Sequence, residues 1–245
     1  MRRLRWMMRQ LLWSVGLSVL ALGGCAMSEP HGTPAAVTIP ADGEVTAVAA
    51  SVVYPAGPWE REAGDTLNGK PMQTRAFATQ PDGEGKWTIV VRQRAREQAA
   101  WTDVQALVLS RDEAGAVQLH ELTTYARGTR AVFTPGLVLC PAEVTGVKHE
   151  ATAAVQSTGL DGNSDKRSGT ATATAVVTGA IDDGARVVAL TLMMKLGPAT
   201  ITRSATFTVP AGAATPSSER SELVVKGGPF VIQREVRERG QPIAR

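Results

Sequence analysis

The sequence predicts a mainly β protein, an antiparallel meander that forms a curved sheet, a half-barrel or a barrel, with few or no helices beyond the leader. Three observations lead to this class. Short β-like runs succeed one another from Trp87 to Arg239, turn signals separate most of them, and helical stretches are scarce. Because the links between runs are mostly short, consecutive strands are expected to be antiparallel neighbours.

The elements are placed by these runs and by the turn residues between them. Asp112-Glu113-Ala114-Gly115 and Gly197-Pro198 are typical of short hairpin links. No strand or helix is predicted over residues 51–85, and residues 94–102 are the only fair helix candidate. The predicted strands are 87–94, 104–111, 116–126, 129–134, 147–157, 169–179, 185–196, 199–209, 221–226 and 229–239.

The core is expected to consist largely of small side chains. Hydrophobic residues make up 43% of the 245 residues, but 36 of them are alanines, and aromatic residues are only 4%. Over residues 170–178, threonine largely alternates with Ala171, Ala173 and Ala175, so one face of this strand is nearly flat. Such a face either lets another layer approach closely or leaves space for a ligand.

Residues 1–24 have the features of a secretory signal peptide. Four arginines precede an apolar stretch over residues 11–22, which is too short to span a bilayer comfortably. The leader ends in Leu22-Gly23-Gly24-Cys25, which resembles the lipobox of bacterial lipoproteins. This resemblance implies cleavage before Cys25, a diacylglyceryl group on its thiol and acylation of the new amino terminus. An ordinary signal peptide, or an anchor helix with a chance cysteine, is the alternative.

A lipidated start would set the organisation of the mature chain. Residues 25–50 are expected to form the lipidated N-terminus and a flexible tether, and residues 51–245 a single β-rich periplasmic domain. Acyl chains contribute about 0.8 kcal/mol per buried methylene, so two or three would hold the protein on a membrane. Ala26 stands where retained inner-membrane lipoproteins of enteric bacteria tend to carry Asp, which favours the outer membrane, facing the periplasm.

The basic character of the chain belongs to the leader. The formal charge is +3, and the four arginines before Cys25 are accompanied by no acidic residue. The mature chain would therefore carry 22 basic and 23 acidic residues, a formal charge of −1 that argues against a nucleic-acid partner. With only two cysteines, a disulfide framework or a four-cysteine zinc site is excluded.

Three polar residues are candidate ligand-binding groups. His149, Arg203 and Glu121 each fall on an apolar face of their strands when positions are counted in twos. A charged group on such a face must be ion-paired, solvated at a rim or bound to a ligand. If the three converge in one cleft, they become its polar anchors, and an anionic head group would suit Arg203.

Other polar motifs receive structural interpretations. Cys140, in an apolar run before Pro141, is predicted to be a buried inert thiol. Residues 161–165 begin like a calcium loop, but Lys166 stands where glycine is required, so a solvated hairpin turn is predicted. The run 234–239 mixes charges at a strand end and is interpreted as a solvated edge. No metal or cofactor is expected.

No catalytic motif accompanies the lipobox, so the leading hypothesis is a lipid-anchored cell-envelope protein that is not an enzyme, with an interaction or structural role. The alternative is a carrier or sensor of a lipid or other apolar ligand, because residues 170–178 present a small-residue face and the faces around Met194 and Phe207 are apolar. The strands also loosely resemble half-barrel lipoproteins of the LolA/LolB and LppX/LprG kind, a resemblance that implies a possible fold. A hydrolase resting on His149 and Glu121 is the third hypothesis. The expected partner is the membrane, through acylated Cys25, and the alternative hypothesis adds an apolar ligand.

Overall fold

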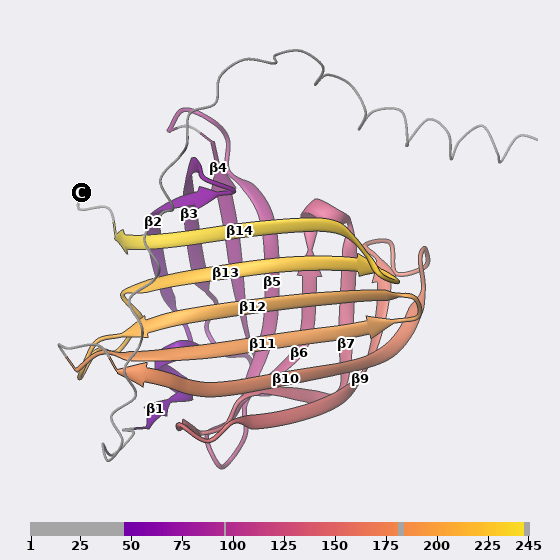
Figure 1. Ribbon diagram of the computed structural model, residues 1–245. Helices are drawn as coiled ribbons and strands as arrows, with labels where there is room; N and C mark the ends of the chain where they lie inside the picture. Colours follow the sequence, from indigo (N-terminus) through magenta and orange to yellow (C-terminus); the bar gives the residue numbers. More distant parts are fainter. Residues whose placement is uncertain (1–46, 96, 181–183, 243–245) are drawn as a thin grey trace, which may run out of the picture. The chain divides into compact units, whose positions relative to one another are not determined.

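Twelve antiparallel strands close into a barrel in the computed structural model, which describes residues 47–95, 97–180 and 184–242 (Figure 1). The predicted signal peptide, Cys25 and most of the predicted tether lie outside these residues. The order around the barrel is β10-β11-β12-β13-β14-β2-β3-β4-β5-β6-β7-β9, and β9 pairs with β10 to close the circle. The predicted mainly β, antiparallel fold is therefore confirmed, in the form of a barrel.

The strands differ in length, and the longest belong to the second half of the chain. The barrel strands are β2 (Trp59–Leu67), β3 (Lys70–Ala78), β4 (Trp87–Arg94), β5 (Thr102–Arg111), β6 (Val117–Thr124), β7 (Thr129–Cys140), β9 (His149–Gly159), β10 (Arg167–Ala180), β11 (Arg186–Leu196), β12 (Ala199–Val209), β13 (Ser218–Gly227) and β14 (Phe230–Pro242). A separate two-stranded sheet pairs β1 (Val48–Ala49) with β8 (Glu143–Val144), and two helical turns, α2 (Ala50–Val53) and η1 (Tyr125–Arg127), complete the described elements.

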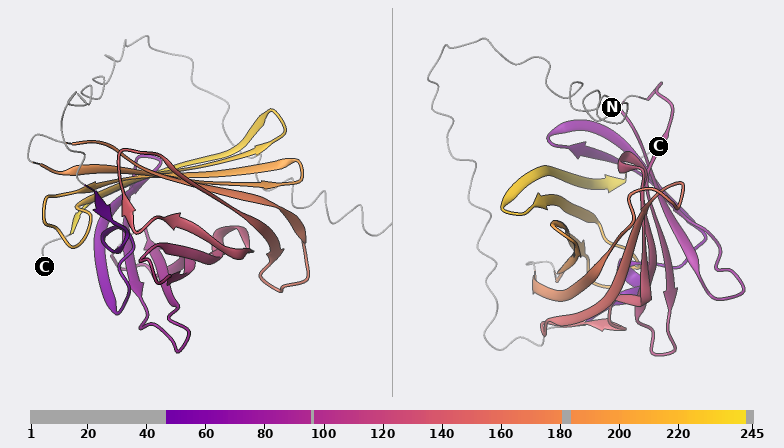
Figure 2. Two further views of the ribbon diagram at one scale, coloured as in Figure 1. Left: turned by 90° about the horizontal axis from the view of Figure 1, so that it is seen from below. Right: turned by 90° about the vertical axis from the view of Figure 1, so that its right-hand side faces the viewer.

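The barrel consists of two layers whose strands cross. In Figure 1, β10 to β14 run across the view in front of β2 to β7, which run up and down. Figure 2 shows β11 to β14, in orange and yellow, lying over the purple and pink strands of the other layer. The layers join at two seams, β7 with β9 and β14 with β2. At the second seam, pairing covers only Arg237 to Pro242 of β14, so the first half of that strand extends beyond β2.

Most predicted strands lie where the sequence placed them, and β4 and β12 have the predicted bounds. The helix predicted over residues 94–102 is wrong. Arg94 ends β4, Thr102 begins β5, and the described residues between them form bends and turns. The Arg94 guanidinium stacks on the ring of Trp101 at 4.4 Å and donates a hydrogen bond to the carbonyl of Glu97, which holds this segment as a loop between adjacent strands.

The segment without assigned elements, residues 51–85, contains the β2–β3 hairpin. Its two-residue turn is Asn68-Gly69, with φ of 50° and 77°, the left-handed conformation that these residue types adopt most readily. The end of the predicted tether also differs from expectation. Val48 and Ala50 are buried, and the Ala50 N–H donates to the carbonyl of Ala142, so the domain begins earlier than residue 51.

Candidate functional site

The barrel contains an interior cavity of about 230 Å³. A single water molecule needs only roughly 10–15 Å³ of such space, so the cavity can hold a ligand of substantial size. Eight-stranded barrels are just wide enough for side chains to fill, whereas wider barrels enclose cavities or channels. Twelve strands with many alanines on their inner faces, such as Ala76 and Ala205, leave this volume open.

The floor of the cavity is apolar and continues into the core. Leu119, Leu122 and Leu190 line the cavity, and each is also buried in the main hydrophobic cluster. Phe207 lies at one side, where its ring meets the edge of Tyr54 with 6.3 Å between ring centroids. Burial raises the pKa of the Tyr54 hydroxyl above its usual value, so this group stays neutral. This part of the cavity suits an apolar chain.

The other side of the cavity is charged, with an excess of arginine. The lining includes five arginines, from β2, η1, β12 and β14, against three glutamates from β13 and β14; they are Arg61, Arg127, Arg203, Arg237 and Arg239 with Glu219, Glu222 and Glu235. Two of the five arginines are neutralised within the cavity. Arg239 contacts Glu219 at 2.9 Å, and Arg237 contacts Glu235 at 3.4 Å.

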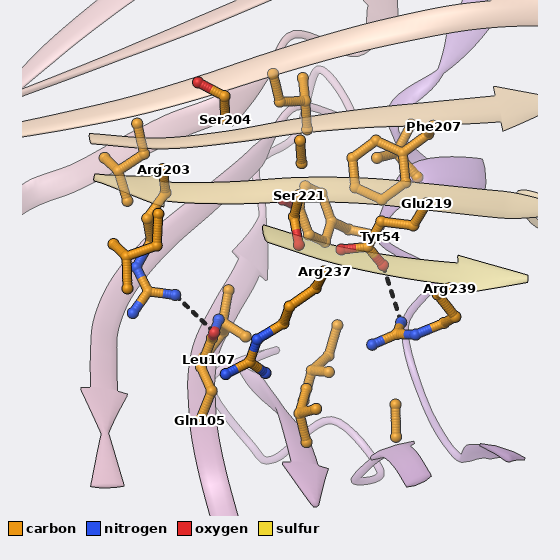
Figure 3. Close-up of a pocket in the computed structure, with 18 of the residues that line it drawn as sticks. Tyr54, Gln105, Leu107, Arg203, Ser204, Phe207, Glu219, Ser221, Arg237 and Arg239 are labelled. Carbon is orange, nitrogen blue, oxygen red and sulfur yellow. Dashed lines mark hydrogen bonds and ion pairs between the residues drawn. The ribbon is translucent and has the colours of Figure 1, made fainter. Parts of the chain in front are cut away.

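Arg203 is held by neutral partners only. It comes from β12, whose alternation turns Arg203, Ala205 and Phe207 into the barrel while Ser204 points the other way (Figure 3). The guanidinium donates hydrogen bonds to Gln105 Oε1 at 2.7 Å and Thr124 Oγ1 at 2.9 Å, and its Nε is buried without a partner. Burial, together with the positive charges of Arg127 and Arg237, lowers the pKa of Arg203 to about 10.

Arg61 and Arg127 also lack an acidic partner. The Arg127 Nη2 donates to Gln233 Oε1 at 2.6 Å, and Arg61 lies over the ring of Trp59 at 5.8 Å. Burial lowers the pKa of both guanidinium groups. Among the described residues, no carboxylate oxygen lies within 4.0 Å of the guanidinium nitrogens of Arg61, Arg127 or Arg203. The cavity therefore has positive charge that the chain itself does not neutralise.

Of the three candidate residues, the structure places only Arg203 among the residues that line the cavity. The sequence left three interpretations for a charged group on an apolar face: an ion pair, a solvated rim or a ligand contact. The ion pair is excluded for Arg203, which has no acidic partner and lies inside the barrel.

Glu121 lies on the other face of its strand from the one predicted. The register of β6 against β7 shifts between Leu119 and Glu121, and this bulge moves Leu122 to the inner face in its place. Glu121 accepts a hydrogen bond from Arg130 at 2.5 Å.

His149 begins β9, half-buried, with its Nε2 buried and unpartnered. It lies far from Glu121. Glu121 is opposite Val132, which is opposite Gln156 on β9, and His149 is seven residues farther along that strand, about 23 Å at 3.3 Å per residue. The three candidates therefore do not meet in one cleft.

Cys140 and the turn over residues 161–165 have the predicted surroundings. Cys140 is fully buried, and burial raises the pKa of its thiol to about 12. Asp161 Oδ1 accepts hydrogen bonds from the N–H groups of Asn163 and Ser164, both at 2.9 Å, in an exposed hairpin turn. In the part of the chain that the structure describes, no three His, Cys, Asp or Glu side chains are placed to hold a metal ion.

The sequence patterns missed the arginines of β14. The run 234–239 was interpreted as a solvated edge, but its alternate residues divide between two faces. Arg234 points outward with 68% of its side chain exposed, whereas Arg237 and Arg239 point inward with 26% and 23% exposed. Charged residues on both faces give no apolar alternation, so nothing in this run marked an inner face.

No known protein family, curated protein or solved structure matches this chain. None of the described helices is long and apolar enough to span a membrane. The function has to be inferred from the barrel, its cavity and the sequence of the leader.

Proposed function

We propose that this protein is a lipid-anchored protein of the bacterial cell envelope that binds an apolar or amphiphilic ligand inside its barrel. The observation that carries the proposal is the cavity of about 230 Å³, with leucines on its floor and arginines at its side. Binding sites for small molecules are typically concave, mostly apolar and provided with a few polar groups that orient the ligand. The cavity has all three properties.

The membrane anchor is supported by the leader sequence alone. Leu22-Gly23-Gly24-Cys25 follows a basic segment and an apolar stretch at the spacing of a lipobox. We propose that acylated Cys25 holds the barrel at the periplasmic face of the outer membrane. A Cys25→Ser variant should then accumulate as unprocessed precursor and take up no labelled palmitate. Normal cleavage of this variant would contradict the anchor without affecting the ligand proposal.

The cavity favours a binding role over the two competing hypotheses. A purely structural lipoprotein gains nothing from an open interior, because an empty cavity forfeits the packing contacts that a filled core would make. A hydrolase based on His149 and Glu121 has no support from their positions, which are about 23 Å apart along the sheet. A binding protein accounts for both the volume and the unneutralised charge.

Native mass spectrometry tests the ligand proposal. A form that starts at Ala26 keeps every described contact, since the barrel and its core lie within residues 47–242. Purified without detergent, it should carry an additional non-covalent mass. Ala205→Phe places a ring in the cavity and should remove that mass, whereas Thr206→Phe, the next residue on the exposed face, should keep it. An empty wild-type protein that takes up neither added dodecanol nor added dodecanoate would contradict the proposal.

A further inference from the structure

We propose that the ligand carries an anionic head group, a carboxylate or a phosphate on an apolar chain, and that Arg203, Arg127 and Arg237 bind it. This inference rests on the proposed ligand-binding function and specifies its chemistry. It starts from charge. These three arginines share one side of the cavity with a single close acid, Glu235, which leaves two positive charges without a counter-charge.

The geometry supports an external anion at this position. Arg203 and Arg237 extend from β12 and β14 into the same space beside Gln105 (Figure 3). Gln105 and Thr124 fix the Arg203 guanidinium, and Gln233 fixes that of Arg127, so the donors are held in place before any ligand arrives. Preorganised arginine donors match the two oxygens of a carboxylate or phosphate, which they can bind in bidentate fashion.

The electrostatic cost of unpaired charge also favours a bound anion. A charge removed from bulk water is costly unless it is paired, and proteins usually place an acid beside a buried arginine. Here the chain instead gathers like charges, since Arg127 and Arg237 both act unfavourably on Arg203 and the favourable effect of Glu235 is smaller than either. An anion bound between them relieves that repulsion and supplies the missing pairing. A neutral ligand leaves the repulsion unchanged, so it gains only the contacts of its apolar chain.

The apolar part of such a ligand has an adjacent surface. Leu107, Leu122 and Leu190 line the cavity together with Arg203, on the strands that face β12 and β14 or lie beside them. A ligand with its head group at Arg203 can therefore extend its chain along these side chains. This division of the cavity into a charged side and an apolar floor identifies a single-chain acidic amphiphile as the ligand class.

Calorimetric titration of the form starting at Ala26 tests the head-group chemistry with three probes of equal chain length: dodecanoate, dodecyl phosphate and dodecanol. The two anions are used below their critical micelle concentrations, and dodecanol is used below its solubility limit. We expect at least one of the two anions to bind ten-fold or more tightly than the alcohol. The preferred anion distinguishes a carboxylate ligand from a phosphate ligand.

Matched variants assign the effect to the cavity. Arg203→Met should weaken binding of the preferred anion about ten-fold or more, the effect expected for a charge-assisted contact, and leave dodecanol binding unchanged. Arg220→Met is the control, because Arg220 lies on the outer face of β13 with 70% of its side chain exposed. Equal binding of alcohol and anions would overturn the anionic head group while preserving the ligand-binding function. Binding of none of the three probes would overturn both.

Discussion

The interior of the barrel has two regions that differ in how the space between the strands is used. At the end of the barrel where β4 and β6 begin and β5 and β7 end, the interior is filled: Trp87, Leu109, Val117, Leu137 and Cys140 are each at most 2% exposed. Around β13 and β14, no described residue is a buried hydrophobic one, and arginines and glutamates line open space instead. The filled region accounts for most of the hydrophobic stabilisation, and the open region is free to carry charge. The following predictions compare the two regions.

The largest difference is expected from removing a leucine in each region. Leu137→Ala should lower the free energy of unfolding by about 3–5 kcal/mol, because its fully buried site cannot collapse around the missing atoms. Leu223→Ala, on β13 at the cavity, should cost about 1 kcal/mol, since its side chain already borders open space. Urea denaturation of both variants gives the two values. Equal losses would mean that the cavity region is packed as tightly as the rest.

Enlarging an alanine should destabilise the protein in the filled region and have little effect on stability at the cavity. Ala175 on β10 is fully buried, so Ala175→Leu should overpack the core and destabilise the protein by about 1–3 kcal/mol. Ala205→Leu adds the same atoms where the cavity can accept them and should change stability by less than about 1 kcal/mol. Thermal unfolding of the two variants measures this difference. A comparable loss for Ala205→Leu would contradict an open cavity at that residue.

Strand β10, in which alanine alternates with threonine, shows how far the sequence determines the fold. Its alternation correctly predicted a strand with a flat inner face, and it left open whether that face packs closely or borders a ligand. Ala171, Ala173 and Ala175 are at most 1% exposed, so close packing is the outcome here. Alternation reports which side of a strand is inner, but the volume beyond that side depends on the closure of twelve strands, a long-range property that no single run encodes.

The residues of the candidate site were predictable only in part for the same reason. Arg203 stood out because its neighbours Ile201 and Phe207 are apolar. Arg237 did not, because charged residues surround it on both sides along the chain, and its role depends on β14 crossing the barrel near β12. Glu121 shows the opposite error: counting in twos fails at a bulge, where one extra residue reverses the face.

Replacing Arg203, which has no acidic partner, should raise the stability of the protein and weaken binding of the proposed anion. Arg203→Met should raise the free energy of unfolding of the empty protein by about 1–2 kcal/mol at pH 7.5, because it removes a half-buried charge that has no acidic partner. Cavity water can satisfy the Gln105 and Thr124 side chains that lose their donor. Urea denaturation measures the gain. A variant less stable than the wild type would indicate that Arg203 is a structural residue.

The pH dependence of that gain follows from the lowered pKa of Arg203, about 10 in the folded protein. The unfolded chain, with the higher pKa of an ordinary arginine, binds more protons above this pH, so wild-type stability receives a positive contribution as pH rises past about 10. The advantage of Arg203→Met should therefore shrink between pH 9 and pH 11. Glu235, Tyr54 and the other arginines near Arg203 are present in both proteins, so the difference between the two isolates Arg203.

The smallest effect is expected from a comparison that needs no substitution. It measures how readily the filled region and β14 open in the folded protein. After removal of residue 25, Cys140 is the only thiol, and burial both hides it and raises its pKa to about 12. Iodoacetamide at pH 8 should label it only through unfolding of the filled region, at a rate set by the stability of the protein.

Backbone amides of the first half of β14, which pairs on one side only, should exchange through smaller openings. Saturation with the preferred anionic probe should slow β14 exchange and Cys140 labelling by similar factors, because in the proposed binding mode both openings release the probe from Arg237. Exchange in β14 that saturation leaves unchanged would contradict the proposed contact of the probe with this strand.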